Sequence, residues 1–210
     1  MLESYKSVRS AGSKEIVIKK SRFIGYIMPV QSEEEAVSFI EDIKKKHWNA
    51  THNCSAYMIG ERDEIQKQSD DGEPSGTAGK PILEVIKNQG LKNVAIVVTR
   101  YFGGIMLGAG GLIRAYTDGA VAAIEAGEVI EWVLHREVFV ELDYTWHGKV
   151  ENELRTEGVR TGETTFADKV TLLCLPYDGE AEAFKDRMID VTQGQAVLTE
   201  GEKLYLIKGE

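Results

Sequence analysis

Residues 93–111 of this 210-residue chain read NVAIVVTRYFGGIMLGAGG. The continuous apolar run over residues 93–99 predicts a central strand that is buried on both faces. The nine residues 103–111 then hold five glycines, which predicts a tight turn, because glycine tolerates backbone angles that other residues avoid. A helix is expected next, since the following apolar positions recur at helical spacing: Leu112, Ile113, Tyr116, Ala120, Ala123 and Ile124.

The chain before this stretch predicts further strands and two helices. Strands are expected over residues 15–20, 22–28, 54–59 and 64–68. Ser32 and Glu35 have the spacing of a capping box, and Ala36, Val37, Ile40 and Ile43 would form the apolar face of the helix that follows. A second helix is expected from Pro81 until Gly90 stops it.

The chain after residue 128 has a different pattern. Strand, helix, strand, strand, helix and strand are expected in turn over residues 136–144, 148–156, 159–166, 169–175, 180–191 and 195–207. This β-α-β-β-α-β order is that of a ferredoxin-like domain. The predicted fold class is therefore α+β, with an N-terminal α/β domain over residues 1–132 and a ferredoxin-like domain over residues 133–210.

Charge and composition narrow the function classes. The net charge is −9, divided into −2 over residues 1–135 and −7 over residues 136–210, which excludes a broad basic surface but leaves room for a local basic site. Cys54 and Cys174 form neither a disulfide framework nor a zinc motif. No apolar run is long enough to cross a bilayer, and residues 1–20 have no apolar signal region. We expect a cytoplasmic protein with no membrane partner.

The glycine cluster is the strongest candidate for a binding site. Free amides at a helix N-terminus attract anions, and Arg100 before the cluster and Arg114, in the expected first helical turn, would supply forked donors for phosphate. The cluster matches neither the Walker A motif nor GxGxxG. It is also explained by a tight connection that needs glycine for packing alone.

The loop over residues 70–79, DDGEPSGTAG, is the second candidate. Its carboxylates have the chemistry to bind a divalent cation or act as a general base, but the spacing fails the calcium-loop template. The alternative is a polar turn followed by a helix cap. Ser75 and Thr77 lack the G-x-S-x-G context of a nucleophile.

A third candidate, residues 47–54 (HWNATHNC), places His52 two residues before Cys54. A metal-ligand pair and a Cys–His dyad are both conceivable here, but a structural or substrate-positioning role is favoured because no further ligands are nearby. Trp48, Tyr101 and Phe102 are expected either to stack on bases or to belong to the core.

Three stretches taken together resemble the Impact family, in its bacterial YigZ/YvyE branch: HNCSAYMIG over residues 52–60, DDGEPSGTAGKP over 70–81 and VTRYFGGIMLGAGGLIRAY over 98–116. The resemblance implies an N-terminal domain similar to the second domain of a small-subunit ribosomal protein. It also implies a ferredoxin-like C-terminal domain similar to one in the translocation factor EF-G. The eukaryotic relatives regulate translation by binding the activator of an initiation-factor kinase, through a further domain that the resemblance does not include.

We therefore expect a non-enzymatic, translation-related protein whose N-terminal domain binds RNA, the ribosome or a nucleotide-like phosphate ligand. A protein partner is possible for the C-terminal domain, and no cofactor, metal or catalytic residue is assigned. The expected phosphate-binding residues are Arg100, Gly103, Gly104, Gly108, Gly110, Gly111 and Arg114. Residues expected to line the same crevice are His52, Asp70, Asp71, Glu73, Ser75, Thr77 and Tyr101.

Two alternatives stay open. One is a metal-assisted enzyme acting on a small phosphorylated substrate, with Asp70 or Asp71 as base or metal ligand and His52 in proton transfer. The other is a regulatory adaptor that binds protein through its C-terminal domain. A fold resemblance alone decides none of these.

Overall fold

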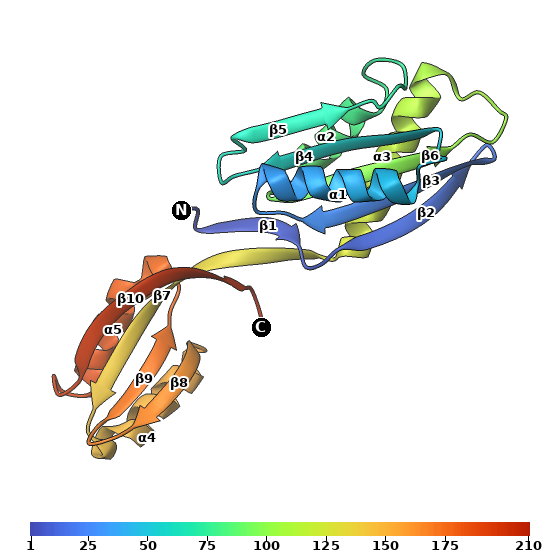
Figure 1. Cartoon of the computed structure of the whole chain (residues 1–210). Coiled ribbons are helices and arrows are strands. Elements are labelled where there is room, and N and C mark those ends of the chain that lie inside the picture. The colour runs from blue at the N-terminus through green and yellow to red at the C-terminus, as the bar shows by residue number, and fades with distance from the viewer. The chain divides into compact units, whose positions relative to one another are not determined.

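A computed structural model describes residues 1–210 as an α+β chain with two antiparallel sheets and five α-helices (Figure 1). This confirms the predicted α+β class. The chain divides into an N-terminal unit, Tyr5–Glu131, and a C-terminal unit that combines Met1–Ser4 with Trp132–Glu210. The first residues join the C-terminal unit through their carbonyl groups: the Leu134 amide donates to the Glu3 carbonyl at 2.9 Å, and the Tyr205 hydroxyl donates to the Leu2 carbonyl at 2.9 Å.

The sheet of the N-terminal unit has the strand order β2-β3-β6-β4-β5, and all neighbouring strands are antiparallel. The strands are β2 (Gly12–Ile18), β3 (Ser21–Pro29), β4 (His52–Ile59), β5 (Ile65–Ser69) and β6 (Val94–Tyr101). The central position of β6 confirms the prediction for residues 93–99. A short strand before them, β1 (Ser4–Val8), was not predicted.

Helices cover both faces of this sheet. Helix α1 (Glu33–Lys46) packs on one face, and α2 (Gly79–Asn88) and α3 (Gly108–Gly127) pack on the other (Figure 1). Alternate β6 residues point to opposite sides, so Val94, Ile96 and Val98 meet α2 and α3 while Ala95 and Val97 meet α1. Because both sides are buried, β6 is apolar at every position from Val94 to Val98.

The structure has the predicted N-terminal cap of α1 and the predicted glycine at the end of α2. The Glu35 amide donates to the Ser32 hydroxyl at 3.2 Å, and the Glu35 carboxylate accepts from the Gln31 amide at 2.7 Å, so the capping box closes one residue earlier than its usual form. Gly90 ends α2 with a φ of +65°. The predicted apolar faces were wrong at Val37 and Ile113, each 42% exposed, because the sheet-facing positions go to their neighbours Phe39 and Leu112.

The C-terminal unit has the predicted β-α-β-β-α-β element order. The elements are β7 (Val129–Leu142), α4 (Tyr144–Thr156), β8 (Arg160–Phe166), β9 (Val170–Leu175), α5 (Ala181–Val191) and β10 (Val197–Ile207), with a short 3₁₀ helix at Asp178–Glu180. Its sheet has five strands in all: the order is β1-β7-β9-β8, and β10 also pairs with β7, antiparallel to it. Strand β7 begins at Val129 rather than at residue 136, because Ile130 and Leu134 are also buried and extend the pairing.

Candidate functional site

The loop over residues 70–79 is folded around the side chain of Asp70. One carboxylate oxygen of Asp70 accepts from the Gly76 amide at 2.8 Å, and the other accepts from the amides of Ala78 and Gly79 at 3.1 and 2.8 Å. Burial raises the pKa of Asp70, but these three amide donors outweigh it and the pKa lies below its usual value. Asp70 therefore serves as the cap of α2, and both of its oxygens are occupied by the chain itself.

Asp71 is held in the same manner. Its carboxylate accepts from the Lys44 ammonium and from the Asn53 amide, each at 2.7 Å. Burial raises the pKa of Asp71, while the bonds from Lys44 and Asn53 lower it by more. The Asp71 carbonyl accepts from His52 Nδ1 at 2.8 Å, so the loop fixes the orientation of the imidazole. Asp71 links α1, β4 and the loop.

Glu73 is the centre of a buried polar network. Its Oε1 accepts from Arg100 Nη1 at 2.6 Å and from the Tyr116 hydroxyl at 2.7 Å. Its Oε2 lies 3.8 Å from His52 Nε2. The Glu73 and Arg100 side chains are only 3% and 7% exposed. The network thus joins residues from β4, the loop, β6 and α3.

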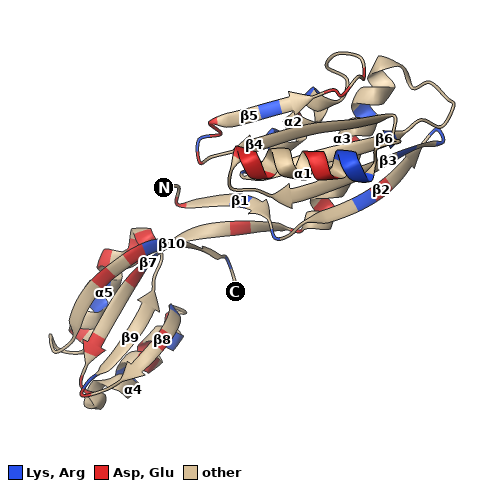
Figure 2. Ribbon diagram, in the orientation of Figure 1, with Lys and Arg blue, Asp and Glu red and all other residues tan.

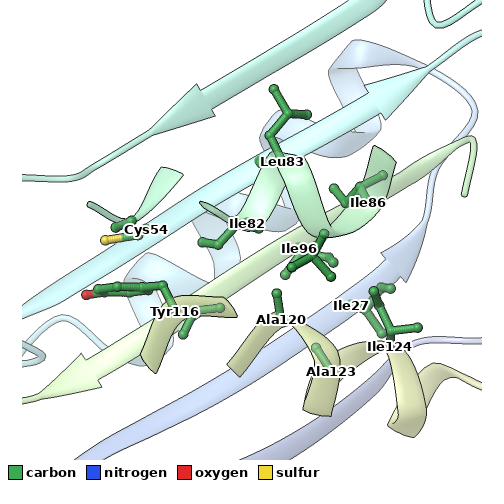
Figure 3. Packing of buried hydrophobic residues seen from close by; sticks show 14 of the residues in the cluster. Ile27, Cys54, Ile82, Leu83, Ile86, Ile96, Tyr116, Ala120, Ala123 and Ile124 are labelled. Carbon is green, nitrogen blue, oxygen red and sulfur yellow. The ribbon is translucent and has the colours of Figure 1, made fainter. Parts of the chain in front are cut away.

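Cys54 adjoins this network. Figure 3 shows the Tyr116 hydroxyl directed toward the Cys54 sulfur, which also donates to the Asp70 carbonyl at 3.0 Å. Burial raises the pKa of Cys54 to about 12, and burial likewise raises the pKa of Tyr116. Neither group is a nucleophile in this state, because the reactive thiolate or phenolate is strongly disfavoured. The structure places Cys54 in the core, as the structural interpretation expects.

The Arg100 guanidinium lies over two aromatic rings. Its guanidinium carbon lies 5.6 Å from the centre of the buried Phe23 ring and 5.4 Å from the centre of the half-exposed Phe102 ring. Its Nε is buried without a hydrogen-bond partner, the only side-chain nitrogen or oxygen in the chain with that property. Stacking of this kind holds the Phe102 ring at the end of the sheet. Because Arg100 already forms a buried ion pair with Glu73, it has fewer donors left to bind the phosphate that the sequence predicted for it.

The glycine cluster is partly helical rather than a loop. Helix α3 begins at Gly108, so Gly108, Gly110 and Gly111 belong to its first turn. Arg114 therefore does not lie in the first helical turn, as the sequence predicted, but nearly two turns along α3. The prediction failed because glycine only weakens a helix, and the packing of Leu112, Ala115 and Tyr116 stabilises this one.

This arrangement leaves bare backbone beneath Arg114. Gly110 and Gly111 are the residues four and three positions before Arg114, so they share its face of the helix. A Cβ atom at Gly108 or Gly110 would meet nothing within 4 Å. The helix has no side-chain N-cap and no acidic residue in its first turn, and Arg114 is exposed and makes no ion pair. The first amides of α3 and one free guanidinium thus face solvent together.

Two cations beside this cluster, Lys19 and Lys20, were not predicted from the sequence as part of the site. They form the β2–β3 turn, which packs so closely on Gly103 that a Cβ there would lie 2.1 Å from the Lys20 carbonyl carbon. Both side chains are exposed and unpaired. Figure 2 shows the blue tip of this turn. Only the strand order β2-β3-β6 brings the turn to Gly103, so no local signal in the sequence indicates it.

The remaining predicted residues are not part of the Glu73 network. Tyr101 points to the opposite face of the sheet, where its hydroxyl bonds His47 Nδ1 at 2.8 Å. Thr77 is buried and donates to the Pro74 carbonyl at 2.6 Å, whereas Ser75 is exposed. Gly104 is exposed with a φ of +84°. Trp48, with 83% of its surface exposed, is not part of the core.

Three further findings concern metal binding, the cysteines and the helices. No group of three or more His, Cys, Asp or Glu side chains is arranged to hold a metal ion. Both cysteines are free, buried thiols. None of the five α-helices has the length and apolar character needed to cross a membrane.

The chain is thus a two-unit α+β protein whose N-terminal unit has a buried Glu–Arg–Tyr network, a helix that starts with glycines and a turn with two lysines against Gly103. Residues 19–124 match the model of the Impact N-terminal domain, and residues 140–195 match that of a domain of unknown function, DUF1949. The chain belongs to the Impact family, which confirms the resemblance seen in its motifs.

Relatives of similar length share both parts. The chain is 52% identical to the IMPACT family member YvyE of Bacillus subtilis, over 99% of this chain and 96% of that protein. It is 36% identical to an IMPACT family member of Haemophilus influenzae, over 94% and 97% of the two chains. A crystal structure titled as a hypothetical protein matches with a TM-score of 0.61 and 29% identity, over 96% of this chain and 99% of that one.

The eukaryotic relatives match only in part. The protein IMPACT of Mus musculus is 36% identical over 44% of this chain and 30% of its own length.

Proposed function

We propose that the N-terminal unit binds single-stranded RNA, with the start of α3 holding a phosphate group, and that the protein is a non-enzymatic, cytoplasmic component of translation. The observation that carries this proposal is the uncapped, glycine-lined start of α3 with the unpaired Arg114 above it. An α-helix N-terminus with free amides favours a phosphate, and a guanidinium adds forked donors.

Two features beside the glycine cluster fit RNA better than an isolated phosphate. Lys19 and Lys20 add two exposed cations next to Gly103, which suits a ligand that carries several phosphates. Phe102 is 49% exposed and held by Arg100, and such a ring is a platform on which a base can stack. Residues 136–210, which make up most of the C-terminal unit, have a net charge of −7, and Figure 2 shows acidic positions on β7, β10 and α5, so we assign this unit no RNA contact.

Fold likeness gives secondary support. The element order of the C-terminal unit and the pairing of its strands as β10-β7-β9-β8 suit a ferredoxin-like domain, and we propose that both units resemble domains of ribosomal and translocation proteins. This support is weaker than the site itself, because one fold serves many functions. The ribosome is the natural larger target if RNA binding is found.

The test is fluorescence anisotropy with a labelled single-stranded RNA of about 12 nucleotides, a length set by typical single-strand site sizes. We expect Arg114→Ala to weaken binding about 10-fold or more, since a charged hydrogen bond contributes about 1.5–3 kcal/mol. Lys19→Ala and Lys20→Ala should each lower the slope of log affinity against log salt by about 0.7.

The matched control is Arg62→Ala, which removes the same charge from the exposed β4–β5 turn of the same unit. Unchanged affinity in Arg114→Ala, or a salt slope near zero for the natural chain, would refute RNA binding at this site. Arg100→Ala is a poor test, because it leaves Glu73 buried without its cation.

A second candidate function rests on a different observation, the buried Glu73 carboxylate beside His52. Since Asp70 and Asp71 are occupied by backbone amides and Lys44, an enzyme in this unit would use His52 and Glu73 for acid–base chemistry on a small phosphorylated substrate. Its test is phosphate release or isomerisation with a panel of sugar and nucleoside phosphates. Turnover in the natural chain that His52→Gln abolishes, with the fold intact, would favour it over RNA binding.

A further inference from the structure

The C-terminal unit contains a cavity of about 670 Å³ that plays no part in the proposed function. Its walls come from the end of α4, the start of β8, the end of β9, α5 and the last residues of the chain. This volume lies within the usual range for small-molecule sites, which is about 300–1,000 Å³. The floor is apolar and is formed by Leu154, Val159, Leu175, Phe184 and Met188.

One cation in the wall lacks an acidic partner. The half-buried Arg160 donates from Nη2 to the Ile207 carbonyl at 3.0 Å and makes no ion pair. Arg187, which also lines the cavity, is paired with Glu157. Because a partly buried guanidinium binds a carboxylate with two parallel hydrogen bonds, Arg160 is the group that fits an anionic end of a ligand.

The wall also contains acids without ion pairs. Glu153 on α4 and Glu180 before α5 line the cavity and make no ion pair. They disfavour a ligand that is purely anionic, and they favour one that also carries an ammonium group. The further charged groups around the cavity are Glu157, Arg187, Lys208 and Glu210.

His135 supplies a sensor within the same wall. Its Nδ1 donates to the Val133 carbonyl at 2.9 Å, which leaves Nε2 as the acceptor of the neutral ring, and its ring centre lies 4.9 Å from that of Tyr177, with the two rings tilted at 45°. Burial lowers the pKa of His135, and the nearby charge of Arg160 lowers it further. An anion bound to Arg160 would therefore raise the pKa of His135.

We propose that this cavity binds a free α-amino acid with a large apolar side chain. Arg160 would hold the carboxylate, Glu153 or Glu180 would hold the ammonium group, and the side chain would lie on the floor between α4 and α5. The proposal is independent of RNA binding, since it uses no residue of the N-terminal unit. It makes the C-terminal unit a sensor of a small metabolite.

The experiment uses the full chain and NMR of its four histidine rings. L-phenylalanine is titrated first, and its dissociation constant is expected at about 0.1–1 mM, as suits a ligand of this size. The His135 signal should shift saturably and its pKa should rise, while His147, which contacts Phe166 rather than the cavity, should not change. Two matched analogues follow, 3-phenylpropionate without the ammonium group and phenethylamine without the carboxylate, each expected to bind about 10-fold more weakly or worse.

Two variants and one matched control complete the test. Arg160→Gln should weaken binding about 10-fold or more, and Arg155→Gln, an exposed arginine of α4 outside the cavity, should not. Ala183→Trp fills the cavity from an exposed α5 position and should abolish binding without unfolding the unit. The proposal is overturned if phenylalanine gives no saturable shift, if 3-phenylpropionate binds as well as phenylalanine, or if the folded Ala183→Trp chain binds normally.

Discussion

The two units each contain an ionic network, and the networks differ in burial. In the N-terminal unit, Glu73 joins Arg100 and Tyr116 where both ionised side chains are less than one-tenth exposed. In the C-terminal unit, Arg136 bonds both Asp178 and Glu200, at side-chain exposures of 21%, 19% and 35%. Lys203 and Lys185 extend this second network at its rim.

The difference in burial means that the two networks contribute differently to the stability of their units. A buried charge that loses its partner keeps the full cost of leaving water, whereas an exposed one is resolvated. The N-terminal network is also tied to four separate segments of its unit through His52, Glu73, Arg100 and Tyr116. We therefore expect it to control whether its unit folds, and the C-terminal network to contribute little.

The two cysteines allow each unit to be measured separately. Cys54 lies in the N-terminal unit and Cys174 in the C-terminal unit, and both are fully buried. Burial raises the pKa of each thiol to about 12, so alkylation requires unfolding. Pulsed alkylation along a urea series, read by mass spectrometry, gives a midpoint for each thiol.

The largest effect is expected from Glu73→Ala. It leaves Arg100 buried without a counter-ion, which costs about 3–5 kcal/mol of folding free energy. The Cys54 midpoint should fall far more than the Cys174 midpoint. Glu84→Ala, an exposed acid on α2, is the control. A Cys54 midpoint equal to that of the natural chain would remove the distinction between the two networks.

A smaller effect is expected from Asp70→Asn. The amide nitrogen replaces one of the two acceptors of Asp70, so at least one backbone amide loses its partner, at a cost of about 1–3 kcal/mol at pH 7. The folded-state pKa of Asp70 is lowered, so its stabilisation is present above the unfolded value of about 3.9 and is lost as pH falls through the folded value.

Acid should therefore reduce the Cys54 midpoint of the natural chain below about pH 4, and reduce it less in Asp70→Asn. The measurement is the same pulsed alkylation at a series of equilibration pH values, with the pulse itself at fixed pH. Asp118→Asn, an exposed acid on α3 without an ion pair, serves as the control. Identical acid profiles for the natural chain and Asp70→Asn would contradict the assigned capping role.

The smallest effect is expected from Asp178→Asn. Asp178 accepts from Arg136 and Lys203 near the surface, where water and salt screen the interaction. The Cys174 midpoint should change little, and the change should shrink further in high salt. A fall as large as that of Cys54 in Glu73→Ala would mean that burial does not separate the networks.

Local sequence patterns predicted most of the elements. The apolar run of β6, the capping box of α1 and the helical spacing of apolar residues in α3 depend on residues at most a few positions apart. Local patterns were wrong where glycine was taken as a boundary: α3 starts at Gly108, and Arg114 is therefore further from the helix start than expected. The Impact motifs also identified the family, since they are long and occur in fixed order.

The tertiary structure decided what surrounds each predicted residue. Glu73 meets Arg100 across 27 positions, Lys20 meets Gly103 across the strand order β2-β3-β6, and Arg160 meets the end of β10 at Ile207. Periodicity reports which face of an element is buried, but not which segments lie beside it. Those neighbours are set by strand order and helix packing, which depend on the free energy of the whole unit rather than on any short stretch of sequence.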